Sequence, residues 1–361
     1  MQDLYPGETL DTIAGYPTIY HYEPSGQQET KALIVCVPGS MHLGRIFYGG
    51  HVGSVSSDFL SHWLSTHGFG VLCLSYPVES NPPVMPHTGA AFRIGDWARQ
   101  AAMTAKEVMS KHNLTTAPVI LISWSMGGRM VVPFTTAARE LGLDVQQFIS
   151  FAATPGFSMT RPSTGLISTK SGYLDIPSSS DVFYHQLAEM HRLNQGRMVI
   201  PHDVYEREYV GATPVGLTAL EMKYAGSGSG DDTDFVEHET SSEEETRVLD
   251  VAEYPFITAV YPTSILDARH ALADRASWGF LLTRKIESAI AKNGLDAASS
   301  WDELLDLVHS APSRLCLPVE GNHFFFVGER TARNAAETVA ELVGRAQKFK
   351  SSCPAAVDDA A

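Results

Sequence analysis

The chain has 361 residues, of which 44% are hydrophobic, and it carries a formal net charge of −15. This apolar content supports a large core and excludes a disordered chain. The acidic balance argues against binding to nucleic acid or to an anionic membrane, because both attract excess lysine and arginine. No apolar run reaches the ~20 residues of a membrane span. Residues 1–17 lack the basic and apolar regions of a signal peptide, so we expect a soluble cytoplasmic protein.

Neither the cysteine spacing nor any known fingerprint indicates a bound metal or cofactor. The four cysteines match no zinc or CxxC pattern, and three of them lie in apolar runs. We expect them to be small buried side chains in a reducing compartment. The sequence has no HExxH motif and no glycine fingerprint for a dinucleotide, so no cofactor is expected. The cysteines are Cys36, Cys73, Cys316 and Cys353.

Short apolar runs alternate with helical patterns over the first 155 residues. Such alternation is typical of βαβ units, whose strands form a mainly parallel sheet. The predicted strands are 32–37, 71–75, 118–123 and 148–153, and the predicted helices are 59–66, 97–109 and 130–138.

The alternation breaks after residue 155. Residues 156–225 combine polar clusters with two helical pieces, 182–194 and 201–210, and are predicted to form an insertion. Residues 226–249 begin with GSGSG and continue with many acidic residues, which is typical of a flexible surface loop.

Sheet-forming sequence returns after the insertion, and we expect it to complete the same domain. The chain then ends in a tail, residues 351–361, that is expected to be frayed. The predicted strands are 256–261 and 314–319, and the predicted helices are 271–291, 301–308 and 331–349.

The segment SWSMGG (123–128) joins a predicted strand to a predicted helix and contains a candidate nucleophile, Ser125. A nucleophile on such a sharp turn needs small residues two before and two after it, because its backbone is strained. Ser123 and Gly127 meet this need, although glycine is usual at the first position. The turn would raise the Ser125 hydroxyl above the sheet and aim the Met126 N–H at a developing oxyanion.

A serine nucleophile needs a base that accepts its proton, and histidine has a suitable pKa. His323 lies in EGNHFFF (320–326), after the last predicted strand, among bulky residues that would exclude water. A carboxylate should hold the imidazole in the right tautomer. Asp267 is the first carboxylate after the strand 256–261 and is our choice, with Asp274 as the alternative. Asp267 could instead pair with Arg269 or cap a helix.

With these elements the chain resembles the α/β-hydrolase superfamily, whose catalytic residues follow the order Ser, acid, His. The resemblance implies an eight-stranded, mostly parallel sheet flanked by helices, formed by residues 1–155 and 250–350. It also implies a helical or irregular cap formed by residues 156–225.

The same resemblance places a second oxyanion donor in PGSMH (38–42), where Ser40 or Met41 would supply the N–H. His42 and His51 could line the site or lie on its rim, and the rim is our choice. A largely apolar pocket is expected beneath the cap. Its candidate residues are Trp124, Phe157, Tyr173, Phe183, Tyr184 and Leu187.

The function favoured by these residues is hydrolysis of an ester or thioester of a small to medium apolar substrate, through an acyl-enzyme on Ser125. The same site also suits an acyltransferase, a cyclase or a lyase of small-molecule biosynthesis. A third possibility, from another class, is a ligand-binding protein that retains the fold without catalysis. In each case the expected partner is a small molecule.

Overall fold

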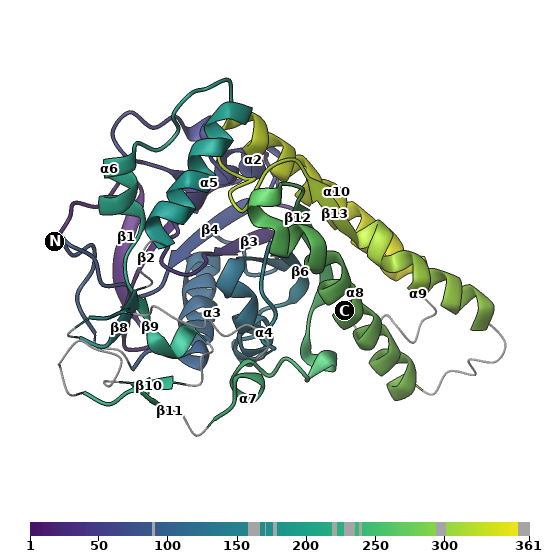
Figure 1. Cartoon of the computed structure of the whole chain (residues 1–361). Helices are drawn as coiled ribbons and strands as arrows, with labels where there is room; N and C mark the ends of the chain where they lie inside the picture. Colours follow the sequence, from purple (N-terminus) through teal and green to yellow (C-terminus); the bar gives the residue numbers. More distant parts are fainter. Residues whose placement is uncertain are drawn as a thin grey trace.

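An eight-stranded sheet forms the centre of the chain in the computed structural model (Figure 1). The order of its strands is β1-β2-β4-β3-β5-β6-β12-β13. β2 pairs antiparallel with both β1 and β4, and the remaining pairs are parallel, so the predicted mostly parallel sheet is confirmed. The strands are β1 (Glu8–Ile13), β2 (Tyr16–Glu23), β3 (Leu33–Val37), β4 (Gly70–Ser75), β5 (Val119–Trp124), β6 (Val145–Phe151), β12 (Phe256–Pro262) and β13 (Cys316–Val319).

The structure describes most of the chain, with gaps at 89–90 and 294–300, in the predicted cap, in the acidic segment and at 353–361. The described residues are 1–88, 91–157, 167–169, 171–175, 179–218, 222–226, 235–237, 240–293 and 301–352. Within them, no helix is both long and apolar enough to cross a membrane. The longer helices are α2 (Leu60–Thr66), α3 (Ile94–Lys111), α4 (Val131–Glu140), α5 (Ser179–Leu193), α8 (Ala268–Asn293), α9 (Trp301–Leu315) and α10 (Glu329–Ser352). The shorter ones are α1 (Arg45–Tyr48), α6 (His202–Val204) and α7 (Ser242–Thr246).

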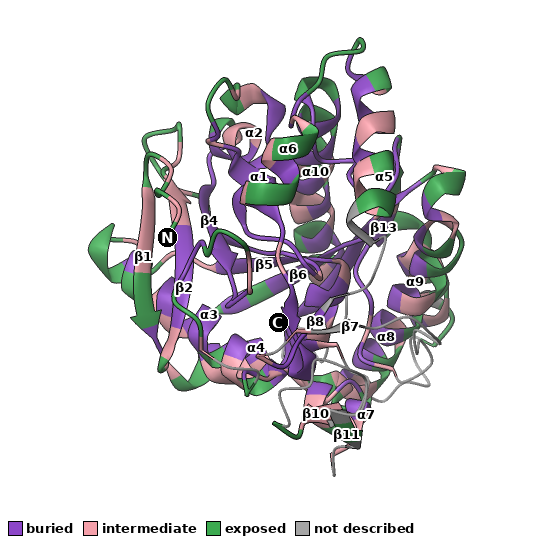
Figure 2. Cartoon of the chain, turned by 60° about the vertical axis from the view of Figure 1, so that its left-hand side comes forward, coloured by how far each residue is buried: buried purple, intermediate pink, exposed green. Residues whose placement is uncertain are grey.

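Helices cover both faces of the sheet, which explains why its parallel strands are continuous apolar runs. Successive side chains of a strand point to opposite faces. Leu33 and Val35 of β3 therefore pack in the core that includes α3, α4 and α8, whereas Ile34 and Cys36 pack in the core that includes α2 and α10. Figure 2 shows the central strands buried between these layers. Cys36, Cys73 and Cys316 are buried free thiols, and Cys353 lies outside the described residues.

The structure differs from the sequence-based elements in several places. The hairpin of β1 and β2 was not predicted, because β1 is half-exposed and lacks an apolar run. Only α6 and one π-helical turn (Tyr205–Tyr209) form where a helix was expected over 201–210. α9 continues to Leu315, so the last strand starts at Cys316.

The acidic segment predicted to be a flexible loop over 226–249 contains regular structure in its described part. β11 (Phe235–Glu237) pairs with β10 (Met222–Tyr224). The N-terminus of α7 is capped by a capping box formed by Ser241 and Glu244. Thr246 of α7 packs closely on Gly156. A Cβ placed on Gly156 would lie only 2.1 Å from the Thr246 hydroxyl oxygen. The flexible-loop prediction is therefore wrong for α7, while residues 227–234 and 238–239 lie outside the described residues.

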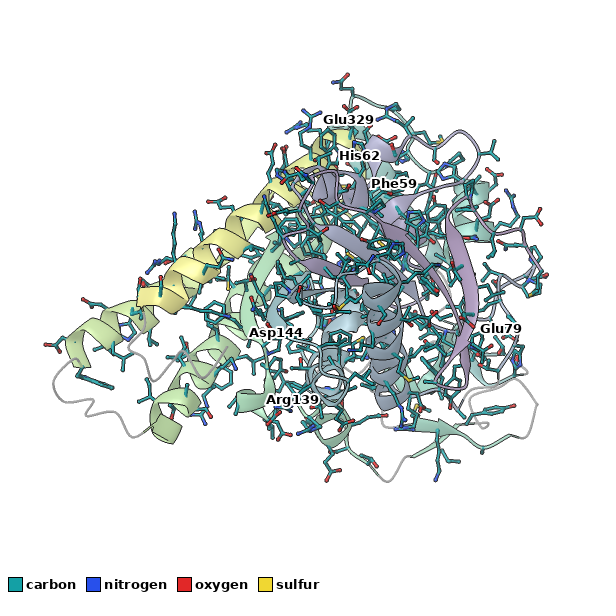
Figure 3. All side chains as sticks on the ribbon, turned by 180° about the vertical axis from the view of Figure 1, so that it is seen from behind. Phe59, His62, Glu79, Arg139, Asp144 and Glu329 are labelled. Carbon is teal, nitrogen blue, oxygen red and sulfur yellow. The ribbon has the colours of Figure 1, made fainter. Side chains whose placement is uncertain are left out.

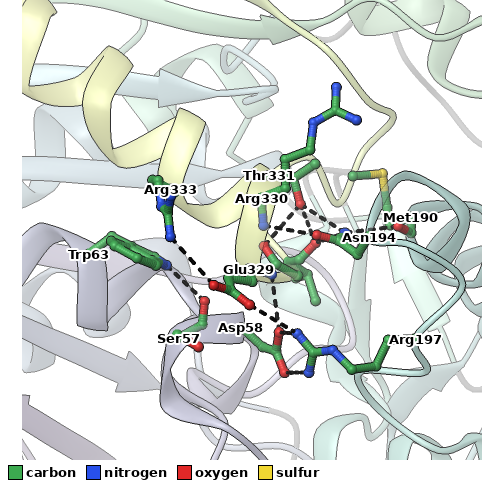
Figure 4. Close-up of polar contacts among 12 residues, drawn as sticks. Ser57, Asp58, Trp63, Met190, Asn194, Arg197, Glu329, Arg330, Thr331 and Arg333 are labelled. Carbon is green, nitrogen blue, oxygen red and sulfur yellow. Dashed lines mark hydrogen bonds and ion pairs between the residues drawn. The ribbon is translucent and has the colours of Figure 1, made fainter.

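The end of α5 is fastened to the start of α10 by a polar cluster (Figure 4). The buried Asp58 carboxylate accepts a hydrogen bond of 3.1 Å from the Glu329 N–H, the first of α10, and pairs with both terminal nitrogens of Arg197. Asn194 accepts a hydrogen bond of 3.0 Å from the Arg330 N–H and donates to the Thr331 hydroxyl. Figure 3 shows Phe59, His62 and Glu329 gathered at this end of the molecule.

Replacing Asp58 should destabilise the fold, because the helix would lose its cap and Arg197 its partner. We expect Asp58→Ala to lower the free energy of unfolding by about 2 kcal/mol in urea denaturation followed by circular dichroism. Asp203→Ala is the matched control, since it removes the carboxylate of an exposed ion pair with Arg207 and should cost less than about 0.5 kcal/mol. Equal midpoints for the two variants would contradict the anchoring role.

Candidate active site

Ser125 lies on a strained turn between β5 and a 3-10 helix (Ser125–Met130), at a backbone φ of 53°. This left-handed conformation costs free energy for a residue with a Cβ, and it persists only where the surroundings enforce it. Two glycines allow the close packing around it. A Cβ at Gly127 would lie 3.2 Å from the Pro38 carbonyl oxygen, and one at Gly128 only 2.5 Å from the Thr154 carbonyl oxygen.

Ser123 occupies the place where this kind of turn usually has glycine. A Cβ at Gly127 would lie 3.3 Å from the Ser123 Cβ, so the two positions face each other and only small residues fit both. The buried Ser123 hydroxyl has no hydrogen-bond partner in the described part of the chain. The hydroxyl therefore contributes no hydrogen bond to the turn within the described residues, and the small size of serine explains its presence.

The His323 imidazole is paired with the Asp267 carboxylate, through a hydrogen bond of 2.8 Å from Nδ1 to Oδ2. Both side chains are buried. Asp267 ends a 3-10 turn (Ile265–Asp267) directly after β12, and His323 follows β13. Asp274, the alternative acid, instead pairs with His270 at 2.9 Å. Of the two acids considered from the sequence, the structure brings Asp267 to His323.

Burial and pairing determine the charge states of this pair. Burial lowers the pKa of His323, and the hydrogen bond to Asp267 opposes this change without reversing it. Burial acts to raise the pKa of Asp267, but the hydrogen bond and charge of His323 outweigh it and hold this pKa below its usual value. At neutral pH the pair is therefore a neutral imidazole beside a carboxylate. With its proton on Nδ1, the imidazole has Nε2 free to accept another.

Trp124 ties the His323 loop to the strand that presents Ser125. Its indole N–H donates a hydrogen bond of 3.0 Å to the His323 carbonyl oxygen, and the two rings lie 5.0 Å apart. On another side Phe183 of α5 stacks on the imidazole, with ring centroids 6.1 Å apart and an angle of 16°. The imidazole is thus enclosed by aromatic rings from the core and from the predicted cap.

The loop after β3 passes directly beside Ser125. A Cβ at Gly39 would lie 2.6 Å from the Ser125 Cβ, so only glycine fits there. The Met41 N–H donates a hydrogen bond of 2.9 Å to the Thr213 hydroxyl. The Ser40 N–H, by contrast, makes no hydrogen bond to any residue in the described ranges. Of the two candidate oxyanion donors in this loop, Ser40 is therefore the one with a free N–H.

His42 and His51 are both buried, so the expectation that they lie on the rim of the site is wrong. His42 Nδ1 donates a hydrogen bond of 2.7 Å to the Ser40 carbonyl oxygen. Nε2 of the neutral ring then accepts a hydrogen bond of 2.7 Å from the Tyr205 hydroxyl. Burial lowers the pKa of His42 to about 3. His51 bonds the Tyr209 hydroxyl at 2.6 Å. His42 follows Gly39 by three residues and His51 directly follows Gly50, and neither position indicates this depth.

Of the six residues predicted to line a pocket, Trp124 and Phe183 contact the His323 ring. Tyr184 packs on His202 and Tyr205, and Tyr173 bonds the Thr88 hydroxyl at 3.0 Å. Leu187 is fully buried in the core that includes α2 and α10, and Phe157 packs at the edge of the opposite core. Their roles in substrate binding stay predictions.

One buried group of metal-ligand types occurs near the site, formed by Asp267, His270 and His323. Their nearest ligand atoms lie within 4.8 Å of one another. Each imidazole already has its own carboxylate, because His323 bonds Asp267 and His270 bonds Asp274. Two neighbouring imidazole–carboxylate pairs account for this cluster.

The turn after β5 carries Ser125, the turn after β12 carries Asp267, and the turn after β13 carries His323, on a sheet of order β1-β2-β4-β3-β5-β6-β12-β13. The chain has the α/β-hydrolase fold. No family model and no curated protein matches its sequence.

Several solved structures resemble this one at low sequence identity. An esterase of Pyrobaculum calidifontis is 13% identical, with a TM-score of 0.46 over 94% of this chain and 84% of that one. A carboxyl esterase from Bacillus coagulans is 9% identical, with a TM-score of 0.46 over 93% of this chain and 97% of that one. A monoglyceride lipase variant from Saccharomyces cerevisiae is 10% identical, with a TM-score of 0.44 over 98% and 97%. These are similarities of fold alone.

The low pKa of His42 predicts that this residue stays neutral throughout the range in which ordinary histidines titrate. In nitrogen-detected NMR of histidine-labelled protein, its ring signals should stay constant from pH 8 to pH 5 and report a proton on Nδ1. The unfolded chain binds this proton near pH 6.5, so His42 lowers the free energy of unfolding as the pH falls from about 6.5 towards 3. Titration of its signals together with those of exposed histidines would contradict the buried neutral state.

Proposed function

We propose that this chain is a serine hydrolase that cleaves a carboxylic ester or thioester through an acyl-enzyme. The observation that carries the proposal is Ser125 on its strained turn, together with the buried pair of His323 and Asp267 that follows the last two strands. This combination supports a nucleophile, a base and an orienting acid, with each residue on a turn that follows a strand of the same sheet.

In the proposed first step, the Ser125 hydroxyl oxygen attacks the substrate carbonyl while His323 Nε2 accepts its proton. The Met126 and Ser40 N–H groups then stabilise the negative charge on the former carbonyl oxygen. The C–O or C–S bond breaks, and the alcohol or thiol leaves with the proton returned by His323. In the second step a water molecule gives a proton to His323 while its oxygen attacks the acyl carbon. The bond between that carbon and the Ser125 oxygen then breaks, and His323 returns the proton to this oxygen, which releases the acid and restores Ser125.

Asp267 supports this cycle by stabilising the imidazolium that forms in each step. The lowered pKa of His323 supports its role as a base, because burial keeps the imidazole neutral at neutral pH and able to accept a proton. Phe183 and Trp124 lie against the same ring and favour an apolar substrate, because they reduce the access of water.

Ser125→Ala should abolish turnover, because it removes the hydroxyl that attacks the substrate in the proposed first step. We expect kcat/KM on p-nitrophenyl butyrate to fall at least about 10³-fold, and covalent labelling by a fluorophosphonate to disappear. Ser123→Ala is the matched control two residues away; it removes a hydroxyl without a partner and should retain activity within about threefold. Absence of labelling in the wild type would instead favour the non-catalytic ligand-binding alternative.

Asp267 and Asp274 are both buried, but they pair with different histidines, so replacing each in turn tests which one supports His323. Asp267→Asn should lower kcat by about 10³- to 10⁴-fold, because an amide cannot hold the imidazole in the same tautomer or stabilise its charge. Asp274→Asn changes only the His270 pair and should lower kcat less than about tenfold. Steady-state kinetics at pH 7 measure both. A larger loss in Asp274→Asn than in Asp267→Asn would refute the assignment of the acid.

A further inference from the structure

Three buried side chains hold the loop that carries the free Ser40 N–H. Tyr76, directly after β4, donates a hydrogen bond of 2.9 Å from its hydroxyl to the Gly39 carbonyl oxygen. His42 donates to the Ser40 carbonyl oxygen at 2.7 Å, and Thr213 accepts from the Met41 N–H at 2.9 Å. Tyr76 and His42 are fully buried, and Thr213 is 1% exposed.

These contacts fix two consecutive peptide planes. The carbonyl of Gly39 and the N–H of Ser40 belong to one trans peptide, so they point in opposite directions. With the carbonyl oxygen held by Tyr76, the Ser40 N–H must point to the other side. The next peptide is held at both of its polar groups, by His42 and by Thr213.

Restraint is needed here because Gly39 has no Cβ to limit its backbone. The same absence of a side chain that lets Gly39 lie against Ser125 also allows its peptide with Ser40 to turn over. A reversed peptide would present a carbonyl oxygen where the N–H is needed, and would repel a developing oxyanion. Burial raises the pKa of the Tyr76 phenol, which keeps its proton available for donation.

Thr213 brings the predicted cap into this arrangement. The neighbouring cap residues also pair with the loop through their backbones: the Leu43 N–H donates to the Tyr209 carbonyl oxygen at 2.9 Å, and the Gly211 N–H donates to that of Met41 at 2.8 Å. This short antiparallel bridge continues to Glu79, which exchanges two backbone hydrogen bonds with Ala212.

We propose that Tyr76 and Thr213 are positioning residues of the oxyanion site: Tyr76 holds the Gly39–Ser40 peptide with its N–H towards Ser125, and Thr213 engages the Met41 N–H. The cap segment 209–213 is then a structural part of that site. This inference rests on the proposed hydrolase function and adds to it the residues that prepare the loop for the transition state.

Kinetics separate positioning from substrate binding. Tyr76→Phe keeps the ring and removes the hydroxyl, so kcat on p-nitrophenyl butyrate should fall by about 10- to 100-fold while KM stays within about threefold. Inhibition by a trifluoromethyl ketone, which forms a tetrahedral adduct, should weaken by the same factor as kcat. Thr213→Ala should lower kcat and weaken the inhibitor in the same way as Tyr76→Phe. Thr213→Ser should keep the wild-type kcat, because it retains the hydroxyl that accepts from the Met41 N–H. Tyr254→Phe, at another buried tyrosine, is the matched control and should match the wild type.

A second measurement reads the loop without relying on activity. The Met41 amide, bonded to Thr213, should exchange its hydrogen at least about tenfold faster in Tyr76→Phe and Thr213→Ala, and unchanged in Tyr254→Phe, as followed by NMR. An unchanged exchange rate in Tyr76→Phe would overturn the inference whatever the activity, and so would faster exchange with wild-type kcat. The wild type could also fail to hydrolyse any ester while the Met41 amide still exchanges faster in Tyr76→Phe. That result would support the positioning of the loop by Tyr76 and Thr213, and would count only against the proposed hydrolase function.

Discussion

The left-handed backbone at Ser125 is the constraint on which the rest of the site depends. A side chain in that conformation is stable only if the chain segments around it approach closely. Gly127 and Gly128 let the turn pack on the ends of β3 and β6, and Gly39 lets the neighbouring loop pass the Ser125 Cβ. The Thr154 N–H donates a hydrogen bond of 2.8 Å to the Ser125 carbonyl oxygen and closes the turn from the β6 side. The close packing that these three glycines allow therefore stabilises the left-handed backbone of Ser125.

The sequence predicts the strands of the sheet core well because their signals are local. β3, β4, β5 and β12 are continuous apolar runs, as expected for strands buried on both faces. The sharp turn at Ser125 is also readable, from small residues between a strand and a helix. The position of Asp267 follows from chain order, since it is the first carboxylate after β12, and the structure pairs it with His323.

The remainder depends on contacts between distant segments, which a local pattern does not contain. β1 is half-exposed and is stabilised by pairing with β2 rather than by an apolar run. Tyr76 and Thr213 reach the same loop from β4 and from the predicted cap, 137 positions apart in the sequence. Nothing in either neighbourhood marks them as members of one site. The depth of His42 likewise results from Tyr205 and Phe183, which come from other elements.

The bridge between the loop after β3 and residues 209–213 has a consequence for the evolution of such chains. A different insertion between β6 and β12 would lack the Thr213 hydroxyl that accepts from the Met41 N–H. It would also have to provide new backbone partners for Met41 and Leu43. Changes in the predicted cap and in the loop after β3 are therefore expected to accompany each other as such chains diverge.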